Sequence, residues 1–314
     1  MTTPTKSQVC NGHSMVGVLR SVMVCPPQAA GWDCAEEVAQ SGELGFPRPP
    51  KFEVAQQQHR ALCEILTNAG AEVFELPASS DLTLDAVYAH DSSLPTDFGV
   101  ILMNPGKKNR VPEAARHGEF CAALGIPVLG EIRAPGTTEA GDMVWIDDHT
   151  LLIGRGYRTN PAGIDQMREL LKPHGVEVLT APLPHGAGPS ECLHLMSLIS
   201  LLDEKTALVD LPWLAVETVE LLKSRNYRFI EIDPAERNGL ACNVLSLGRR
   251  LVAIEENRNT NQRLRDAGFQ VFTFPGSEIC TNGAGGPTCL TRPLLRVDSQ
   301  KAPDSFPRAL TPNC

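Results

Sequence analysis

The chain has 314 residues, of which 42% are hydrophobic and 21% charged, as is typical of a soluble globular protein with one large domain or two small ones. Its formal net charge of −9 argues against nucleic acid or an anionic membrane as the main partner. Residues 1–30 lack the layout of a signal peptide, and no apolar run of about 18 residues is present, so we expect a cytoplasmic protein.

Both ends of the chain are predicted to be tails. Residues 1–15 are mostly polar, and residues 298–314 are rich in proline and show little periodicity. We therefore expect a single catalytic domain over residues 16–297, between a disordered N-terminal tail and a C-terminal tail. A Pro- and Gly-rich stretch at 42–50 is predicted to be a loop near the start of this domain.

Between the tails, one order of elements recurs five times. The first unit is predicted to have a strand over 19–25, a helix over 52–69 and a strand over 72–76. Each later unit is predicted to have two strands, a helix and a further strand. These elements are expected at 87–89, 100–103, 113–124 and 127–129; at 143–146, 150–153, 161–172 and 177–179; at 194–202, 206–210, 213–224 and 228–232; and at 244–247, 250–253, 259–267 and 270–274.

Five such units, each with one amphipathic helix to cover its strands, indicate an internal structural repeat. The arrangement that buries every helix most economically is a ring, with the helices outside and a channel at the centre. An open α/β sheet with ordinary alternation of strands and helices is the alternative that the pattern leaves open.

The ten cysteines are scattered without a CxxC pair, so zinc-finger spacing is absent and most are expected to be reduced structural thiols. Cys289 differs in its surroundings, because it follows a turn with three glycines in four positions, residues 283–286. Such a turn lets the backbone approach a ligand closely and places a thiol where it could act as a thiolate nucleophile. A structural cysteine beside a glycine-rich turn is the alternative.

Three further segments contain groups suited to acid–base chemistry or to binding a cation. Glu139 and Asp142 enter the third unit, and two such carboxylates can either bind a guanidinium or cap a turn. His194 lies in an apolar segment of the fourth unit, where it is either a core residue or a proton donor and acceptor. Residues 85–91 of the second unit supply further carboxylates.

The positions of these groups within their units favour one shared site. Asp91, Glu139, His194 and Cys289 each stand at the equivalent place, where a unit begins. In a ring, equivalent places converge on the central channel. Four unrelated structural coincidences at such places are less plausible than a single functional site.

On these motifs the chain resembles the guanidino-group modifying (pentein) superfamily, and within it the dimethylarginine dimethylaminohydrolase family. The resemblance covers residues 16–295 and depends on Glu-Ala-Gly-Asp at 139–142, Leu-His-Leu at 193–195 and Gly-Gly-Pro-Thr-Cys at 285–289. It implies a five-bladed α/β propeller of ββαβ units with pseudo-fivefold symmetry. It also implies a homodimer as a family expectation.

The resemblance further implies roles for single residues. Cys289 would be the nucleophile and His194 the general acid and base, with Glu139 as the third catalytic group. The implied substrate contacts are Asp91 together with Glu139 for the guanidinium, Arg110 and Arg158 for an α-carboxylate, and Asp85 and Tyr88 in the pocket wall. Asp142 is a further candidate substrate contact, from its place beside Glu139. One departure is His90, which stands where related chains have Glu and so removes an expected anionic contact.

The implied activity is cysteine-dependent hydrolysis of a guanidino amino acid through an S-alkyl thiouronium intermediate. Methylated arginine would give citrulline and methylamine or dimethylamine, and no cofactor or metal is expected because the substrate itself is positively charged. Arginine deiminase, citrulline hydrolase and amidinotransferase activities at the same site are alternatives. A non-catalytic guanidine sensor and an unrelated Cys–His amidase are the remaining ones.

Overall fold

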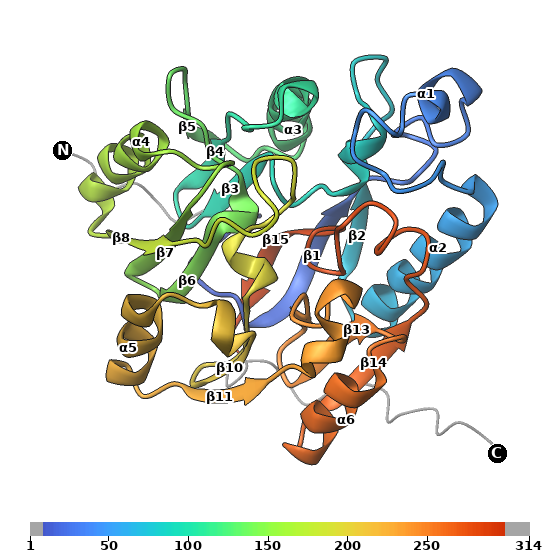
Figure 1. Cartoon of the computed structure of the whole chain (residues 1–314). Coiled ribbons are helices and arrows are strands. Elements are labelled where there is room, and N and C mark those ends of the chain that lie inside the picture. The colour runs from blue at the N-terminus through green and yellow to red at the C-terminus, as the bar shows by residue number, and fades with distance from the viewer. Residues whose placement is uncertain (1–8, 299–314) are drawn as a thin grey trace.

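The computed structural model describes residues 9–298, which form five small sheets of three strands each (Figure 1). In each sheet the middle strand is antiparallel to one neighbour and parallel to the other. The sheets are β15 (Arg292–Val297), β1 (Val18–Val24) and β2 (Glu72–Glu75); β3 (Ser93–Thr96), β4 (Gly99–Leu102) and β5 (Val128–Glu131); β6 (Met143–Asp147), β7 (Thr150–Arg155) and β8 (Glu177–Pro182); β9 (Ile199–Asp203), β10 (Thr206–Val209) and β11 (Arg228–Glu231); and β12 (Leu245–Ser246), β13 (Arg250–Ile254) and β14 (Gln270–Phe274). The expected five-bladed α/β propeller is confirmed.

Helices connect the parallel strands of each sheet, since a parallel pair needs a long crossover. Figure 1 shows these helices on the outside of the ring of sheets. They are α2 (Phe52–Asn68), α3 (Val111–Ala123), α4 (Pro161–Leu171), α5 (Val216–Ser224) and α6 (Arg258–Asp266), and a short extra helix, α1 (Ala35–Ala39), precedes α2. In α2, Leu62 and Leu66 lie one turn apart and are fully buried, and each such burial contributes about 1.5–3 kcal/mol. None of the helices within 9–298 is long and apolar enough to cross a membrane.

The first sheet joins the two ends of the described chain. Strand β15 pairs antiparallel with β1, with Val297 opposite Val18 and Arg292 opposite Met23. The sequence pattern did not predict β15, so its first unit lacked a strand that the others have. The C-terminal strand supplies that missing strand and closes the ring.

The N-terminal boundary differs from the expected one. Residues 9–15, expected to belong to a tail, pack onto the propeller. The backbone N–H of Asn11 donates to the carbonyl of Leu294 at 2.8 Å, and its side chain bonds both the N–H and the carbonyl of Arg296. Cys10 is fully buried, and the ring of His13 stacks on Trp145 at 3.9 Å. The remaining predicted tail residues, 1–8 and 299–314, lie outside the described residues.

One predicted strand is a turn in the structure, and another begins with one. The apolar run expected at 87–89 starts within a 3-10 turn over Leu84–Val87, and the strand begins only at Ser93. The strand expected from His194 begins at Ile199, after a 3-10 turn over Leu195–Ser197. Both runs bury their apolar side chains in a turn, which short apolar segments do as readily as strands. His194 is therefore in the connection before a strand.

Candidate active site

A cavity of about 670 Å³ is lined by most of the residues that the sequence singled out. Its walls include Cys289, His194, Asp91, Asp85, Tyr88, Arg110 and Arg158. Asp91 precedes β3, His194 precedes β9 and Cys289 precedes β15, so connections into three different sheets meet here. The predicted convergence of equivalent positions is thus the arrangement that the structure has.

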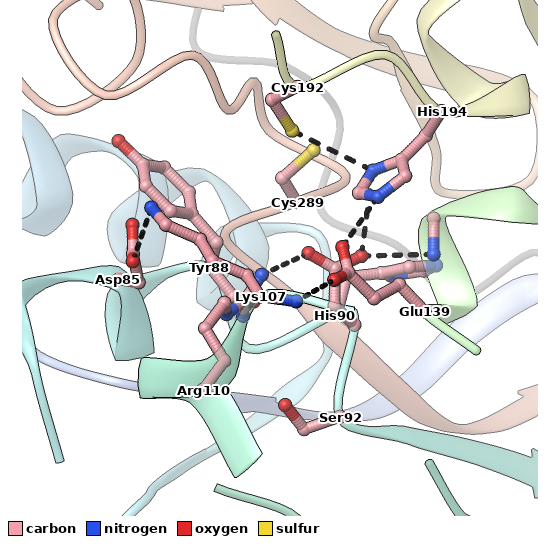
Figure 2. A network of polar contacts seen from close by, with 12 residues as sticks. Asp85, Tyr88, His90, Ser92, Lys107, Arg110, Glu139, Cys192, His194 and Cys289 are labelled. Atoms are coloured by element: carbon pink, nitrogen blue, oxygen red, sulfur yellow. Dashed lines mark hydrogen bonds and ion pairs between the residues drawn. The ribbon is translucent and has the colours of Figure 1, made fainter. Parts of the chain in front are cut away.

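His194 and Glu139 form a buried hydrogen-bonded pair (Figure 2). The imidazole Nε2 lies 2.7 Å from Glu139 Oε2, while Nδ1 lies 3.8 Å from Asp91 Oδ1 and 3.9 Å from Cys192 Sγ. Burial lowers the pKa of His194, but Cys192, Asp91 and Asp142 raise it, and the resulting pKa lies well above the usual value of a histidine. Glu139 therefore orients the imidazole, and the raised pKa favours its protonated form, which is the form of a general acid.

Asp91 is held in place by Arg110. The guanidinium Nη1 of Arg110 forms an ion pair with Asp91 Oδ2, and the Gly141 N–H donates to Asp91 Oδ1 at 2.9 Å. Burial raises the pKa of Asp91, whereas His194 and Arg110 lower it, and the net direction is downward. Asp91 is therefore an ionised carboxylate on the cavity wall, suited to a cationic ligand.

Cys289 follows the glycine-rich turn in a tightly packed position. A Cβ on Gly285 would lie 2.3 Å from the Tyr88 ring, and one on Gly286 would lie 2.6 Å from Asn243 Oδ1. These close approaches explain why the turn needs glycine. Burial, Asp91 and Cys192 raise the pKa of the Cys289 thiol and His194 and Asn243 lower it, and the net pKa is about 12. The nucleophile is thus a neutral thiol until a positive charge arrives.

Asn243 is a contact of Cys289 that the sequence analysis missed. Its Nδ2 donates to Cys289 Sγ at 3.1 Å, and its Oδ1 accepts the Thr288 N–H at 3.0 Å. Asn243 stands just before β12, the place in the fifth sheet equivalent to those of Asp91 and His194. The repeat itself was the signal that could have identified it.

The family model for arginine deiminase matches residues 85–216 and 211–296, which together exceed half of the chain. The chain belongs to the arginine deiminase family. The N(G),N(G)-dimethylarginine dimethylaminohydrolase of Streptomyces coelicolor is 30% identical over 217 residues, 69% of this chain and 77% of that protein. These findings place the chain among the guanidino-group modifying enzymes, as an amidino-group hydrolase or transferase.

Two solved structures are similar to this member of the family. The enzyme DDAH from Pseudomonas aeruginosa, a mutant in complex with citrulline, is 25% identical, with a TM-score of 0.71 over 89% of this chain and 100% of that one. The N-terminal domain of a cyanobacterial arginine dihydrolase, bound to product, has a TM-score of 0.74 at 21% identity over 88% of this chain and 97% of that one. The second likeness concerns the fold alone.

Within this family member, two of the predicted substrate contacts have other partners. Asp142 is fully buried away from the cavity, its Oδ1 accepts the Leu195 N–H at 2.9 Å, and burial raises its pKa to about 6. Glu139 is also fully buried behind His194 and does not line the cavity. From these contacts we propose that Asp142 supports the turn after His194 and that Glu139 orients the imidazole.

Arg110 lines the cavity, but its donors are largely occupied. Nε and Nη2 bond the two oxygens of Glu113 at 2.9 and 2.8 Å, Nη2 also bonds the Tyr88 carbonyl at 2.8 Å, and Nη1 pairs with Asp91. Four of its five N–H groups are used in this way. Arg110 therefore anchors Asp91, and the binding of an α-carboxylate falls first to other cations of the cavity.

Two such cations are Arg158 and Lys107. Arg158 lies on the wall with longer contacts of 3.3 and 3.4 Å to Glu139, which leaves most of its donors for a ligand. Lys107 pairs with Asp85 at 2.6 Å and donates to the carbonyl of Leu44 at 2.5 Å. Because Leu44 belongs to the Pro- and Gly-rich loop, Lys107 ties that loop over the cavity mouth.

His90 turns away from the cavity. Its Nδ1 contacts the Thr291 carbonyl at 2.9 Å, and burial, reinforced by Arg292, lowers its pKa well below the usual value. His90 therefore does not take over the role of the acidic residue that related chains have at this position.

A possible cation site is formed by Asp91, Glu139 and His194, whose ligand atoms lie within 4.8 Å of one another. A metal ion there would have to displace the ion pair of Asp91 with Arg110 and the hydrogen bond between Glu139 and His194.

Proposed function

We propose that the protein hydrolyses methylated arginine to citrulline and methylamine or dimethylamine. The observation that carries this proposal is the meeting of Cys289, His194 and the ionised Asp91 in one cavity. A thiol, an imidazole and a fixed carboxylate are the groups needed to bind a guanidinium and to cleave its C–N bond. Similarity to dimethylarginine dimethylaminohydrolases over most of the chain supports the methylated substrate.

Substrate binding is the first step, and it brings the positive charge of the guanidinium next to the Cys289 thiol. Asp91 binds the guanidinium beside the thiol, and Arg158 binds the α-carboxylate, with Lys107 as the second cation near the mouth. The bound guanidinium lowers the pKa of Cys289 from its raised resting value, because an adjacent positive charge stabilises a thiolate. The thiol then releases its proton to solvent water in the cavity, and it does so only when substrate is present.

The Cys289 thiolate attacks the guanidinium carbon and forms a tetrahedral adduct. His194, protonated at rest, donates its proton to the methylated nitrogen, and the amine departs to leave an S-alkyl thiouronium. Water takes the place of the amine and gives a proton to the now neutral His194. The resulting hydroxide attacks the same carbon, and the C–S bond breaks. The hydroxyl proton of the adduct passes to the departing thiolate, so citrulline leaves and the resting thiol is restored.

Product analysis tests the proposal. We would incubate the protein with arginine, monomethylarginine, asymmetric dimethylarginine and citrulline in water enriched in ¹⁸O, and compare it with Cys289→Ser. Citrulline labelled with ¹⁸O, formed from the methylated arginines and absent with the variant, is the expected result. Ammonia from arginine, ornithine from citrulline, or label-free products that need an added amine acceptor would assign deiminase, citrulline hydrolase or amidinotransferase activity instead.

A further inference from the structure

Strand β15 buries two arginines at the centre of the propeller. The buried positions of the strand alternate, and Arg292 and Arg296 occupy two of them, with 4% and 6% of their surface exposed. Leu294 lies between them on the same face. Inward-facing positions of a strand usually hold apolar side chains, so two guanidinium groups here need an explanation.

Neither arginine has an acidic partner within residues 9–298. Arg296 donates to the carbonyls of Gly17 and Ser246 at 2.6 and 2.8 Å, and Arg292 donates to the carbonyl of His90 at 2.5 Å. The Nε of Arg292 is buried without a hydrogen-bond partner. The acidic group that most favours the charge of Arg292 is Asp91, which is already paired with Arg110.

Both groups nevertheless remain cations near neutral pH. Burial lowers the pKa of Arg292 to about 9 and that of Arg296 to about 10, and both values stay above 7. Two buried positive charges without a counter-charge are unfavourable unless an anion accompanies them.

A small cavity beside the two guanidinium groups has room for such an anion. Its volume is about 40 Å³, roughly three times the ~10–15 Å³ that one water needs. Its polar wall includes Arg292, Arg296, Asn11 and Ser14, and its apolar wall includes Trp145 and Met196. Among residues 9–298, no carboxylate lines it. A mixed positive and apolar wall of this size suits a small monovalent anion of the halide type.

This cavity is separate from the active site, since the two share no lining residue. Adjacent residues of the chain separate the two cavities. His90 and Thr288 line the small cavity, while their neighbours Asp91 and Cys289 line the large one. A ligand in the small cavity therefore lies behind the catalytic residues and does not compete with the substrate.

We propose that the small cavity is a binding site for a halide-type monovalent anion, the counter-ion of Arg292 and Arg296. Chloride fits the size and charge of the site, and bromide is its heavier substitute for measurement. Occupancy stabilises the folded chain, because only the folded state assembles the two guanidinium groups around the cavity.

Thermal unfolding of the full chain tests the proposal, with sodium gluconate replaced stepwise by chloride or bromide at constant ionic strength. We expect a saturable rise of about 3 °C in Tm, because gluconate is too large for the cavity. Arg292→Gln should abolish this rise, and Arg133→Gln, a change at an exposed arginine, should retain it. A rise that does not saturate, or equal Tm values in all three salts, overturns the proposal.

Two further experiments test the proposal even if Arg292→Gln fails to fold: a variant that supplies its own carboxylate, and bromide soaking of crystals. Ser14 Oγ already accepts the N–H groups of Val16 and Gly17 at 3.3 and 3.0 Å, so Ser14→Asp keeps that turn and adds a fixed carboxylate beside the cavity. We expect a higher Tm without chloride and a smaller chloride response. Crystals of the wild-type chain soaked in bromide should show an anomalous peak between the two guanidinium groups, and no peak there contradicts the proposal.

Discussion

Asn243 donates its side-chain N–H to Cys289 Sγ at 3.1 Å, and its side-chain oxygen accepts a hydrogen bond from the Thr288 N–H of the same turn. This one residue therefore fixes the position of the thiol and lowers its pKa. It also completes the pattern of the site, because with it every sheet of the propeller sends a polar group toward the substrate or toward a residue that acts on it.

Asn243→Ala should reduce kcat/KM about 10- to 100-fold, because a hydrogen bond to a charged group contributes about 1.5–3 kcal/mol. The same change should raise the pH at which Cys289 reacts with iodoacetamide, which a purely structural defect would not do. Asn243→Asp should be worse, since a carboxylate repels the thiolate. Gln262→Ala, on the exposed face of α6, is the control. An unchanged pH profile of alkylation would remove Asn243 from the proposed role.

Glu139→Gln distinguishes orientation of His194 from contact with the substrate. Loss of the carboxylate that bonds Nε2 lowers the pKa of His194, because the imidazolium loses an anionic partner. We expect kcat to fall about 100-fold with little change in KM, and the basic limb of the pH–rate profile to move to lower pH. Glu131→Gln, at an exposed position, should leave both constants unchanged. A change mainly in KM would instead favour the direct guanidinium contact expected from the sequence.

The fold was accessible from sequence because the five units repeat the same alternation of short strands and one amphipathic helix. Strand β15 was not, since its inward positions at Arg292 and Arg296 are charged and Pro293 interrupts the pattern. That strand has the reverse of the usual apolar alternation. The two inward arginines that made β15 hard to predict are also the residues that line the small cavity.

The site was predictable where position in the repeat marked it, as for Asp91, His194 and Cys289. The roles of Glu139 and Arg110 were not, because they depend on partners 55 and 19 residues away along the chain. A carboxylate that orients an imidazole and one that binds a substrate have the same sequence signature. Only the three-dimensional contacts separate them.

Arg158→Met should weaken substrate binding without preventing folding. Its contacts to Glu139 are long, so the loss of binding free energy arises mainly from the missing partner of the α-carboxylate. We expect KM for a methylated arginine to rise at least 10-fold, while KM for the decarboxylated analogue stays nearly constant. Equal increases for both substrates would mean that Arg158 does not bind the carboxylate.

Arg110→Met should destabilise the protein, in contrast to Arg158→Met. It leaves Asp91 and Glu113 buried without their cation, and removing one partner of a buried ion pair costs about 3–5 kcal/mol. Urea unfolding at neutral pH measures this loss, and a fall in stability smaller than that of Arg158→Met would contradict the anchoring role.

Two buried histidines should make the protein sensitive to mild acid. Burial lowers the pKa of His59 to about 4 and that of His117 to about 3, whereas both titrate near 6.5 when unfolded. Below pH 6.5 these two histidines bind more protons in the unfolded chain than in the folded one, so their contribution to stability falls as pH falls through the window from 6.5 toward 4 and 3. Each histidine contributes a slope of about 1.4 kcal/mol per pH unit there. Paired carboxylates such as Asp91 lose their contribution only near and below pH 4.

Urea unfolding between pH 8 and 4 measures that slope. His117→Asn should reduce it by about one proton, or 1.4 kcal/mol per unit, because the amide does not titrate. His149→Gln is the matched control, since His149 is exposed. Its slope should equal that of the wild-type chain. If His117→Asn also retained the full slope between pH 6 and 4, the imidazole of His117 would already be protonated in the folded state, and its burial without a charge would be disproved.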